Sequence, residues 1–172
     1  MPKKFQSITF ERRPTNRLRL YELRLLIDGV DLCELVRVFE LPFAGKGAGK
    51  YSGVQWRLPA DAQDLTRHYL GDPSGLHLYR DSRTEILVCD CGIPGCWPLA
   101  CRIRVTSKGV YWSDFIQPHR TGRRRRMAHL GLWDYAGFGP FFFERAQYEE
   151  ALLAAQRGVR RANAALKRIW GA

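Results

Sequence analysis

The sequence of 172 residues has little acidic charge, little cysteine and no long apolar run. Its 17 aspartates and glutamates stand against 28 lysines and arginines, which gives a formal net charge of +11. No apolar stretch approaches the roughly 18–20 residues of a membrane-spanning helix, and the N-terminus lacks the apolar segment of a secretion signal. Five cysteines are too few, and odd in number, for a disulfide scaffold. These absences predict a cytoplasmic protein without a membrane partner.

The composition is typical of a folded domain, with 45% hydrophobic, 12% aromatic and 26% charged residues. A chain of this length can bury about 70% of its unfolded surface in one core, whereas two independent cores would be cramped. We therefore expect residues 1–172 to form a single domain.

The N-terminal third predicts a strand followed by a short helix. Apolar residues alternate with charged ones over a half-buried strand at Tyr21, Leu23, Leu25 and Ile27. Asp28 and Gly29 then favour a tight turn. An apolar spacing of three and four residues predicts a helix from about 32 to 40, with Asp31 as its N-cap and Pro42 as its end. An extended conformation of residues 36–39 is the alternative.

The rest of the chain completes an α+β fold. Three sequential strands with short connections predict an antiparallel β-meander at about 85–116. A C-terminal amphipathic helix follows from an apolar stripe at Tyr148, Leu152, Ala155, Val159, Ala162, Leu166 and Ile169. We expect this helix to cover one face of the sheet, with the N-terminal strand and short helix packed beside it.

The glycine-rich stretch 44–53 comes close to a phosphate-binding loop. A lysine follows its third glycine, but Tyr51 stands where the magnesium-binding hydroxyl of Ser or Thr is required. Ser52, Gly53 and Pro59 also argue against the helix that should follow such a loop. The stretch therefore predicts a flexible loop within the domain and no nucleotide site.

The strongest local signal is a group of cysteines. Cys89 and Cys91 are two residues apart, so their sulfurs project to one face of a strand. The turn at 92–95 brings Cys96 beside Cys91. The sequence therefore predicts three thiols at one hairpin tip, and such a group is a candidate zinc site.

Zinc needs about four ligands, and the fourth stays open at the level of the sequence. Cys101 is one candidate, although its position in the strand pattern places it among core residues. His119 and His129 are the other two. The same thiols also fit two different interpretations: inert buried cysteines, or a reversible disulfide between Cys91 and Cys96 across the turn.

Several motifs resemble a family of small uncharacterised bacterial proteins. They are Ile27-Asp-Gly-Val-Asp-Leu-Cys-Glu-Leu-Val-Arg37, Glu40-Leu-Pro-Phe-Ala44, Cys91-Gly-Ile-Pro-Gly-Cys-Trp-Pro-Leu99, Tyr111-Trp-Ser-Asp-Phe-Ile-Gln-Pro-His-Arg120 and Gly137-Phe-Gly-Pro-Phe-Phe-Phe-Glu-Arg-Ala-Gln-Tyr148. The resemblance spans most of the chain. It implies a shared fold and a bacterial, cytoplasmic, single-domain protein, and it implies no activity, cofactor or catalytic residue.

The basic residues are unevenly distributed. Two groups of arginines are candidates for anion binding: Arg123, Arg124, Arg125 and Arg126 in a block, and Arg157, Arg161 and Arg168 in the C-terminal helix. Arginine forks suit phosphates and carboxylates, so either a nucleic acid or an acidic protein fits as a partner. The sequence carries no recognisable base-reading motif. The block of four arginines should lie in an exposed loop because its charges repel one another.

The function that these patterns favour is a non-catalytic binding or interaction module with a structural cysteine hairpin. Asp114 and His119 are polar groups among aromatic residues, but the known nucleophile and metalloprotease signatures are missing. A small thiol-dependent enzyme or redox protein is the main alternative, and a nucleic-acid-binding protein is the other.

Overall fold

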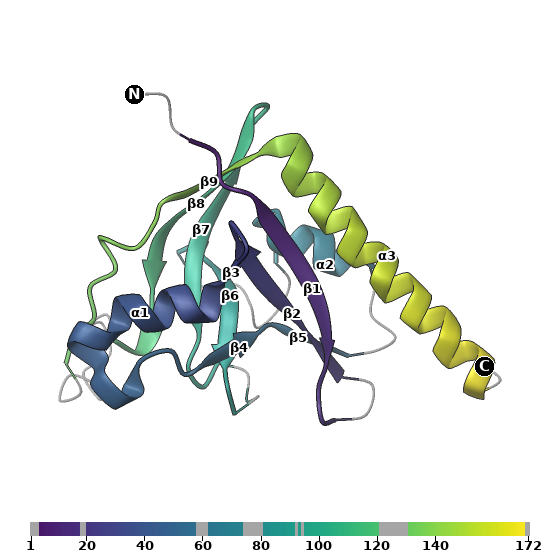
Figure 1. Cartoon of the computed structure of the whole chain (residues 1–172), viewed down its shortest axis with the longest axis horizontal. Coiled ribbons are helices and arrows are strands. Elements are labelled where there is room, and N and C mark those ends of the chain that lie inside the picture. The colour runs from purple at the N-terminus through teal and green to yellow at the C-terminus, as the bar shows by residue number, and fades with distance from the viewer. Residues whose placement is uncertain are drawn as a thin grey trace.

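The computed structural model of the chain describes residues 4–17, 20–57, 62–73, 81–91, 93, 95–120 and 131–170. This part forms two antiparallel sheets with three α-helices, which confirms the predicted α+β class (Figure 1). The helices are α1 (Leu32–Ala44), α2 (Ala62–Tyr69) and α3 (Arg145–Trp170). The first sheet contains β1 (Ile8–Pro14), β2 (Leu20–Ile27), β3 (Val30–Asp31) and β5 (Gln55–Arg57). The second contains β4 (Tyr51–Gly53), β6 (Thr84–Cys89), β7 (Leu99–Val105), β8 (Gly109–Ile116) and β9 (Phe141–Glu144).

β2 is the central strand of the first sheet and pairs antiparallel with β1, β3 and β5. The predicted alternation holds, because its apolar residues are at most 3% exposed at Tyr21, Leu23, Leu25 and Ile27. The predicted turn is also present, with φ of 49° at Asp28 and 79° at Gly29. β1 is hard to predict because only Ile8 and Phe10 mark its buried face. It becomes a strand by pairing with β2 over its whole length.

The second sheet has the strand order β4-β6-β7-β8-β9. Its three central strands follow one another antiparallel, so the meander predicted at about 85–116 is confirmed. Each edge gains one strand beyond that prediction. At one edge, β9 is a run of phenylalanines without alternation, Phe141 to Phe143, and its partner β8 holds it in the sheet. At the other edge, the three-residue β4 pairs with β6.

The two sheets are joined on both sides. On one side the segment 51–57 serves both, since β4 pairs with β6 and β5 pairs with β2. On the other side the Gln6 backbone N–H donates to the Phe142 carbonyl at 2.7 Å, immediately before β1 begins. The strands therefore surround one core, whose largest fully buried side chains include Trp112, Phe143 and Tyr148.

The helix predicted from about 32 to 40, with its end at Pro42, instead continues to Ala44. Proline removes its own backbone hydrogen bond and crowds the carbonyl four residues before it, but it stands here in the last turn, where little helix remains to be disrupted. Side-chain packing stabilises that turn, since the Phe39 and Phe43 rings lie 5.6 Å apart. The predicted N-cap is confirmed by the Asp31 carboxylate, which accepts from the Cys33 backbone N–H at 2.9 Å.

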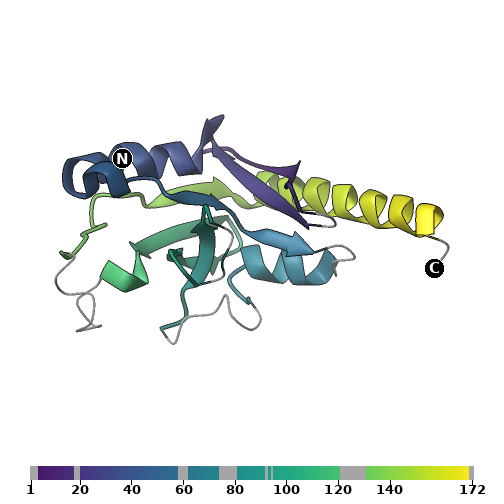
Figure 2. The same ribbon diagram turned by 90° about the horizontal axis from the view of Figure 1, so that it is seen from below.

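The helix α3 packs against β1 and α2. Its predicted stripe is confirmed from Tyr148 to Val159, where all four stripe residues are at most 5% exposed. The Leu166 and Ile169 side chains lie outside the described residues. Figure 2 shows that the C-terminal part of α3 extends away from the sheets, and the described residues Arg161, Ala164, Ala165 and Arg168 are accordingly exposed.

The glycine-rich stretch 44–53 is not the flexible loop that we expected. Residues Gly45–Gly47 form a short 3-10 turn, η1, and Tyr51 begins strand β4. A helix precedes this stretch and a strand follows it, which reverses the strand–loop–helix order of a phosphate-binding loop. The conclusion that it is no nucleotide site of that type therefore stands on the topology as well.

Candidate metal centre

Three cysteines converge at the hairpin between β6 and β7. The Sγ atoms of Cys89, Cys91 and Cys96 all lie within 4.8 Å of one another. Cys89 is buried at the end of β6, whereas Cys91 and Cys96 are exposed on the turn that follows. The hairpin arrangement predicted from the cysteine spacing is therefore present. In the described part of the chain this is the one group of three histidine, cysteine or acidic residues close enough to hold a metal ion.

Two of the thiols differ in acidity. Hydrogen bonds from the Cys89 thiol and from the Ile93 backbone N–H stabilise the Cys91 thiolate and lower the pKa of Cys91 from its ordinary value. Burial has the opposite effect on Cys89 and raises its pKa to about 12. Cys91 therefore becomes a thiolate, the form that binds metals and attacks electrophiles, more readily than Cys89 does.

The structure decides between the proposed fourth ligands only in part. Cys101 is fully buried in the core, away from the three-thiol group, and burial raises its pKa well above the ordinary value. The strand places the Cys101 side chain on the interior face, and Cys101 is not among the residues whose ligand atoms meet in this group. His119 lies near the hairpin, but its Nε2 is 2.8 Å from the Gly95 carbonyl oxygen and outside the group. His129 lies outside the described residues.

An arginine between two indoles supports the hairpin from one side. The Arg120 Cζ lies 4.9 Å from the ring centroid of Trp97, the residue after Cys96, and 4.8 Å from that of Trp133. The Arg120 carbonyl also accepts from the Trp133 backbone N–H at 3.1 Å. These contacts tie the cysteine hairpin to the segment that begins at residue 131.

A buried carboxylate of α1, Glu40, contacts the strand next to the thiols and was not predicted. Glu40 is fully buried and accepts hydrogen bonds from the Tyr51 hydroxyl at 2.8 Å, from the Gly49 backbone N–H at 2.8 Å and from the Tyr135 hydroxyl. Burial raises the pKa of both tyrosines, so both stay protonated donors. One signal in the sequence pointed to this group: Glu40 continues the buried spacing of Leu32 and Val36 along α1.

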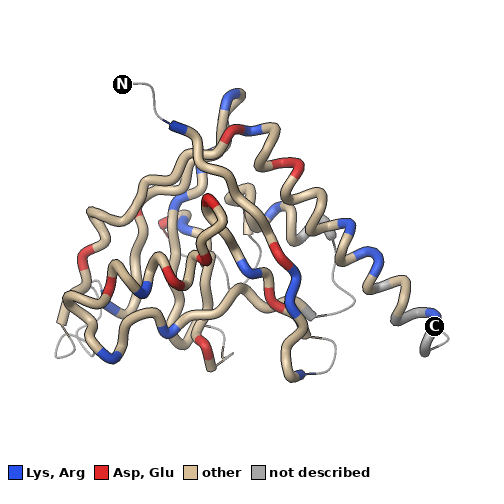
Figure 3. Tube along the Cα trace, viewed as in Figure 1, with Lys and Arg blue, Asp and Glu red and all other residues tan. Residues whose placement is uncertain are grey.

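The arginines predicted to bind anions fall into two classes. Arg123, Arg124, Arg125 and Arg126 lie outside the described residues. Arg157, Arg161 and Arg168 are exposed on α3, as predicted. Figure 3 shows that the charges along the second half of this helix are all basic, and the sequence has no acidic residue after Glu150. Arg12 and Arg13 add exposed positive charge on the neighbouring strand β1.

Asp114 and His119, the polar groups that the sequence places among aromatic residues, each have partners of their own. The Asp114 carboxylate pairs with Arg102 at 3.3 Å, and both side chains are about half exposed. His119 is engaged with the Gly95 carbonyl and with the Trp97 ring, whose centroid is 6.4 Å from its own. These contacts do not assemble a proton-transfer pair.

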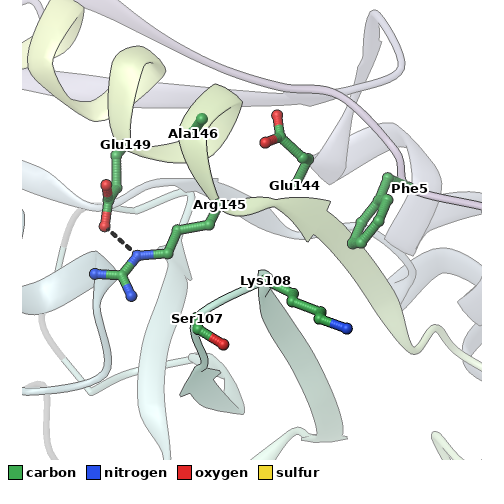
Figure 4. A pocket seen from close by; sticks show the side chains of 7 residues that line it. All are labelled: Phe5, Ser107, Lys108, Glu144, Arg145, Ala146 and Glu149. Atoms are coloured by element: carbon green, nitrogen blue, oxygen red, sulfur yellow. Dashed lines mark hydrogen bonds and ion pairs between the residues drawn. The ribbon is translucent and has the colours of Figure 1, made fainter.

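A pocket of about 500 Å³ opens where α3 begins (Figure 4). Three of the four charged side chains that line it already serve the helix: Arg145 pairs with Glu149 at 2.7 Å, and the Glu144 carboxylate accepts from the Gln147 backbone N–H at 3.2 Å. Such pairs stabilise the first turn of a helix. The fourth is Lys108, from the turn between β7 and β8. Most of the charge in this pocket is therefore explained by the helix itself.

Comparison of the chain with protein-family models, with curated proteins and with solved structures gave no match. Of the helices in the described ranges, none combines the length and the apolar character needed to cross a membrane.

Proposed function

We propose that the protein is a non-catalytic interaction module of the cytoplasm whose cysteine hairpin is held by a zinc ion. The observation that carries the proposal is the approach of the Cys89, Cys91 and Cys96 sulfurs to within 4.8 Å of one another. Sulfurs that are each ~2.3 Å from a tetrahedral zinc lie ~3.8 Å apart, so only small side-chain rotations are needed to bind the ion. The cytoplasm keeps such thiols reduced and available.

The three sulfurs favour zinc over harder ions. Thiolates are soft ligands that select zinc and copper(I) rather than magnesium or calcium. Cys91 is more easily deprotonated than Cys89, and a bound cation would favour the thiolate form of its ligands. The fourth position remains for water, for His119 or for His129. Binding would cross-link a turn that His119 already contacts at the Gly95 carbonyl.

The test is a metal measurement on freshly purified protein. We expect about one zinc per chain by elemental analysis, and a lower midpoint of thermal unfolding after treatment with a chelator, because structural metal binding is coupled to folding. Cys96→Ser should remove the metal. Cys33→Ser is the matched control, since Cys33 lies on α1 outside the group. Metal-free wild-type protein with unchanged stability in the chelator would contradict the proposal.

One observation favours a second candidate, a thiol-dependent enzyme or redox protein. Cys91 is exposed and has a lowered pKa, and both features are typical of reactive cysteines. In that case the purified protein should be free of metal and should form a disulfide within the group when mildly oxidised. Peptide mapping after oxidation distinguishes the two functions, because a zinc-bound group resists the same oxidant.

An anionic partner fits the exposed arginines of α3. The second half of that helix presents only basic charges, and β1 adds two more beside it. We propose an acidic protein or a nucleic acid as the partner. Nucleic acid requires binding tighter than the ~10⁻⁴–10⁻⁶ M of nonspecific complexes at physiological salt. Fluorescence anisotropy with single- and double-stranded oligonucleotides at about 150 mM salt measures this, and weaker binding leaves the acidic protein.

The resemblance to a family of small uncharacterised bacterial proteins remains a hypothesis. It extends over the hairpin motif Cys91-Gly-Ile-Pro-Gly-Cys-Trp-Pro-Leu99, which contains two of the three proposed ligands. A bacterial origin and a cytoplasmic location would agree with the zinc proposal, since both place the thiols in a reducing compartment.

A further inference from the structure

A second pocket, of about 510 Å³, lies away from the start of α3. It opens between the last four residues of β8, the segment 133–140 and Arg83, which directly precedes β6. Its floor is aromatic, because Phe115, Tyr135 and Phe138 line it while each stays at most 8% exposed. The volume falls in the range of small-molecule sites, which commonly combine apolar walls with a few placed polar groups.

Backbone strain concentrates at this pocket. Among the described residues three non-glycine residues have positive φ, and Asp28 is one that a tight turn explains. The other two are Ser82, with φ of 64°, and Asp114, with φ of 54°. They lie on either side of Arg83, since Ser82 precedes it in the chain and the Arg83 Nε donates to the Asp114 carbonyl at 2.7 Å. Strained residues of this kind cluster at binding and active sites.

The strain at Asp114 comes from a β-bulge. Ala100 pairs with Ile116 whereas Arg102 pairs with Ser113, so β8 has one residue more than β7 over this interval. Bulges redirect side chains and are common beside functional sites. This one brings the Asp114 carboxylate to the pocket wall from the middle of a strand.

The polar groups of the pocket are mainly acidic, in a protein whose formal net charge is +11. Asp114 and Asp134 both line it, and each is exposed. One oxygen of the Asp114 carboxylate pairs with Arg102 at 3.3 Å, and one oxygen of the Asp134 carboxylate accepts from the Ala136 backbone N–H at 2.9 Å, which leaves the second oxygen of each carboxylate as an acceptor. The one arginine in the lining, Arg83, already contacts the Asp81 carboxylate and the Asp114 carbonyl. The side chain of Arg83 is only 16% exposed, so it acts as a support for the bulge.

We propose that this pocket binds a planar organic cation, an amidinium or guanidinium group carried on a flat apolar body. The two carboxylates supply charge-assisted acceptors that match the paired N–H groups of such a cation. The aromatic floor takes the apolar body and excludes water from the ion pair. The group belongs either to a free small molecule or to an arginine side chain of a peptide, which present the same chemistry.

Three probes of equal shape and different charge test the proposal: benzamidine, neutral benzamide and anionic benzoate. In calorimetric titrations of the full-length protein we expect saturable binding of benzamidine and at least about tenfold weaker binding of the other two, as loss of a charged hydrogen-bonding partner predicts. The Asp114→Asn and Asp134→Asn substitutions should each weaken benzamidine binding by a similar factor. Asp72→Asn is the control, because Asp72 pairs with Arg67 and does not line the pocket.

A second variant separates binding from folding. Glycine adopts positive φ without strain, so Asp114→Gly should raise the midpoint of thermal unfolding while it abolishes benzamidine binding. The proposal does not depend on the zinc hairpin, and a Cys91→Ser protein should bind benzamidine as wild type does. N-acetylarginine amide and a peptide with an internal arginine then distinguish a free ligand from a peptide ligand.

Equal affinity for benzamidine and benzoate would overturn the proposal, and so would the absence of saturable benzamidine binding. Unchanged benzamidine affinity in both the Asp114→Asn and the Asp134→Asn proteins would overturn it as well, because the two carboxylates are its basis.

Discussion

Two polar clusters lie side by side in this fold and differ in how completely their groups are paired. Tyr51 and Cys89 are direct partners across the β4–β6 pair, so the Glu40 cluster and the thiol cluster share one sheet edge. In the Glu40 cluster one buried carboxylate accepts three hydrogen bonds. In the thiol cluster three sulfurs meet with two of them exposed, and the Cys89 thiol donates to the Asp90 carboxylate at 3.7 Å, a long and weak hydrogen bond.

The difference indicates where a ligand belongs. A buried polar group whose hydrogen bonds are all made contributes to stability and has no free donor or acceptor for a ligand. A group of ligand atoms that converge at the surface contributes little by itself and is completed by an ion. We therefore assign stability to the Glu40 cluster and metal binding to the thiol cluster, and the following predictions test that division.

The largest effect is expected at Glu40. Glu40→Ala removes the acceptor of the buried Tyr51 and Tyr135 hydroxyls and of the part-buried Gly49 N–H. Each buried unsatisfied group costs about 1–3 kcal/mol, so we expect a loss of about 3–5 kcal/mol in the free energy of unfolding. Urea denaturation with a tryptophan fluorescence signal measures it.

Glu34→Ala on the same helix is the control for Glu40. Its exposed carboxylate pairs with Arg37 three residues away, and such surface pairs are worth less than about 1 kcal/mol. A Glu40→Ala protein that loses no more unfolding free energy than this control would show that the hydrogen bonds of the buried cluster contribute little to stability. The contrast between the two clusters would then disappear.

A smaller effect separates two cysteines of one hairpin. Cys101 is fully buried, so Cys101→Ser places a hydroxyl in the core and should cost about 1–3 kcal/mol with or without metal. Cys91 is exposed, and Cys91→Ser should leave the stability of the metal-free protein within about 0.5 kcal/mol. Thermal unfolding in chelator tests both. Equal losses would mean that the exposed thiol is structural in its own right.

Local pattern predicts much of this molecule. The alternation in β2, the Asp31 cap of α1, the stripe of α3 and the thiol hairpin all follow from residues close together in the chain. The elements that escaped prediction depend on distant partners. β9 lacks alternation and is a strand because of β8, and Glu40 is satisfied by Tyr135, which lies 95 residues away. The spacing along α1 marks Glu40 as buried, but it does not reveal a partner at that separation.

Thiol alkylation tests whether the cysteines differ in acidity as their surroundings predict. Iodoacetamide reacts with thiolates, and the pKa of Cys91 is lowered while the pKa values of Cys89 and Cys33 are raised to about 12. In metal-free protein Cys91 should therefore react first, and its rate should level off at a lower pH than the rates of the other two. Peptide mapping after short exposures at pH 6–9 measures this. Added zinc should suppress the reaction at Cys91, and an unprotected Cys91 would count against the metal site.

The smallest effect is expected at the residue that links the two clusters. Arg120 lies between Trp97, next to the thiols, and Trp133, near Tyr135 of the Glu40 cluster. Arg120→Lys keeps the charge but loses the planar group that stacks between two indoles, and it should cost about 0.5–1 kcal/mol. Arg120 contacts Trp97, the residue after Cys96. The free energy of zinc binding, measured in a competition titration, should therefore fall by more than the free energy of unfolding measured in urea. A variant that loses stability and keeps wild-type zinc affinity would show that the hairpin is organised independently of the segment beyond residue 131.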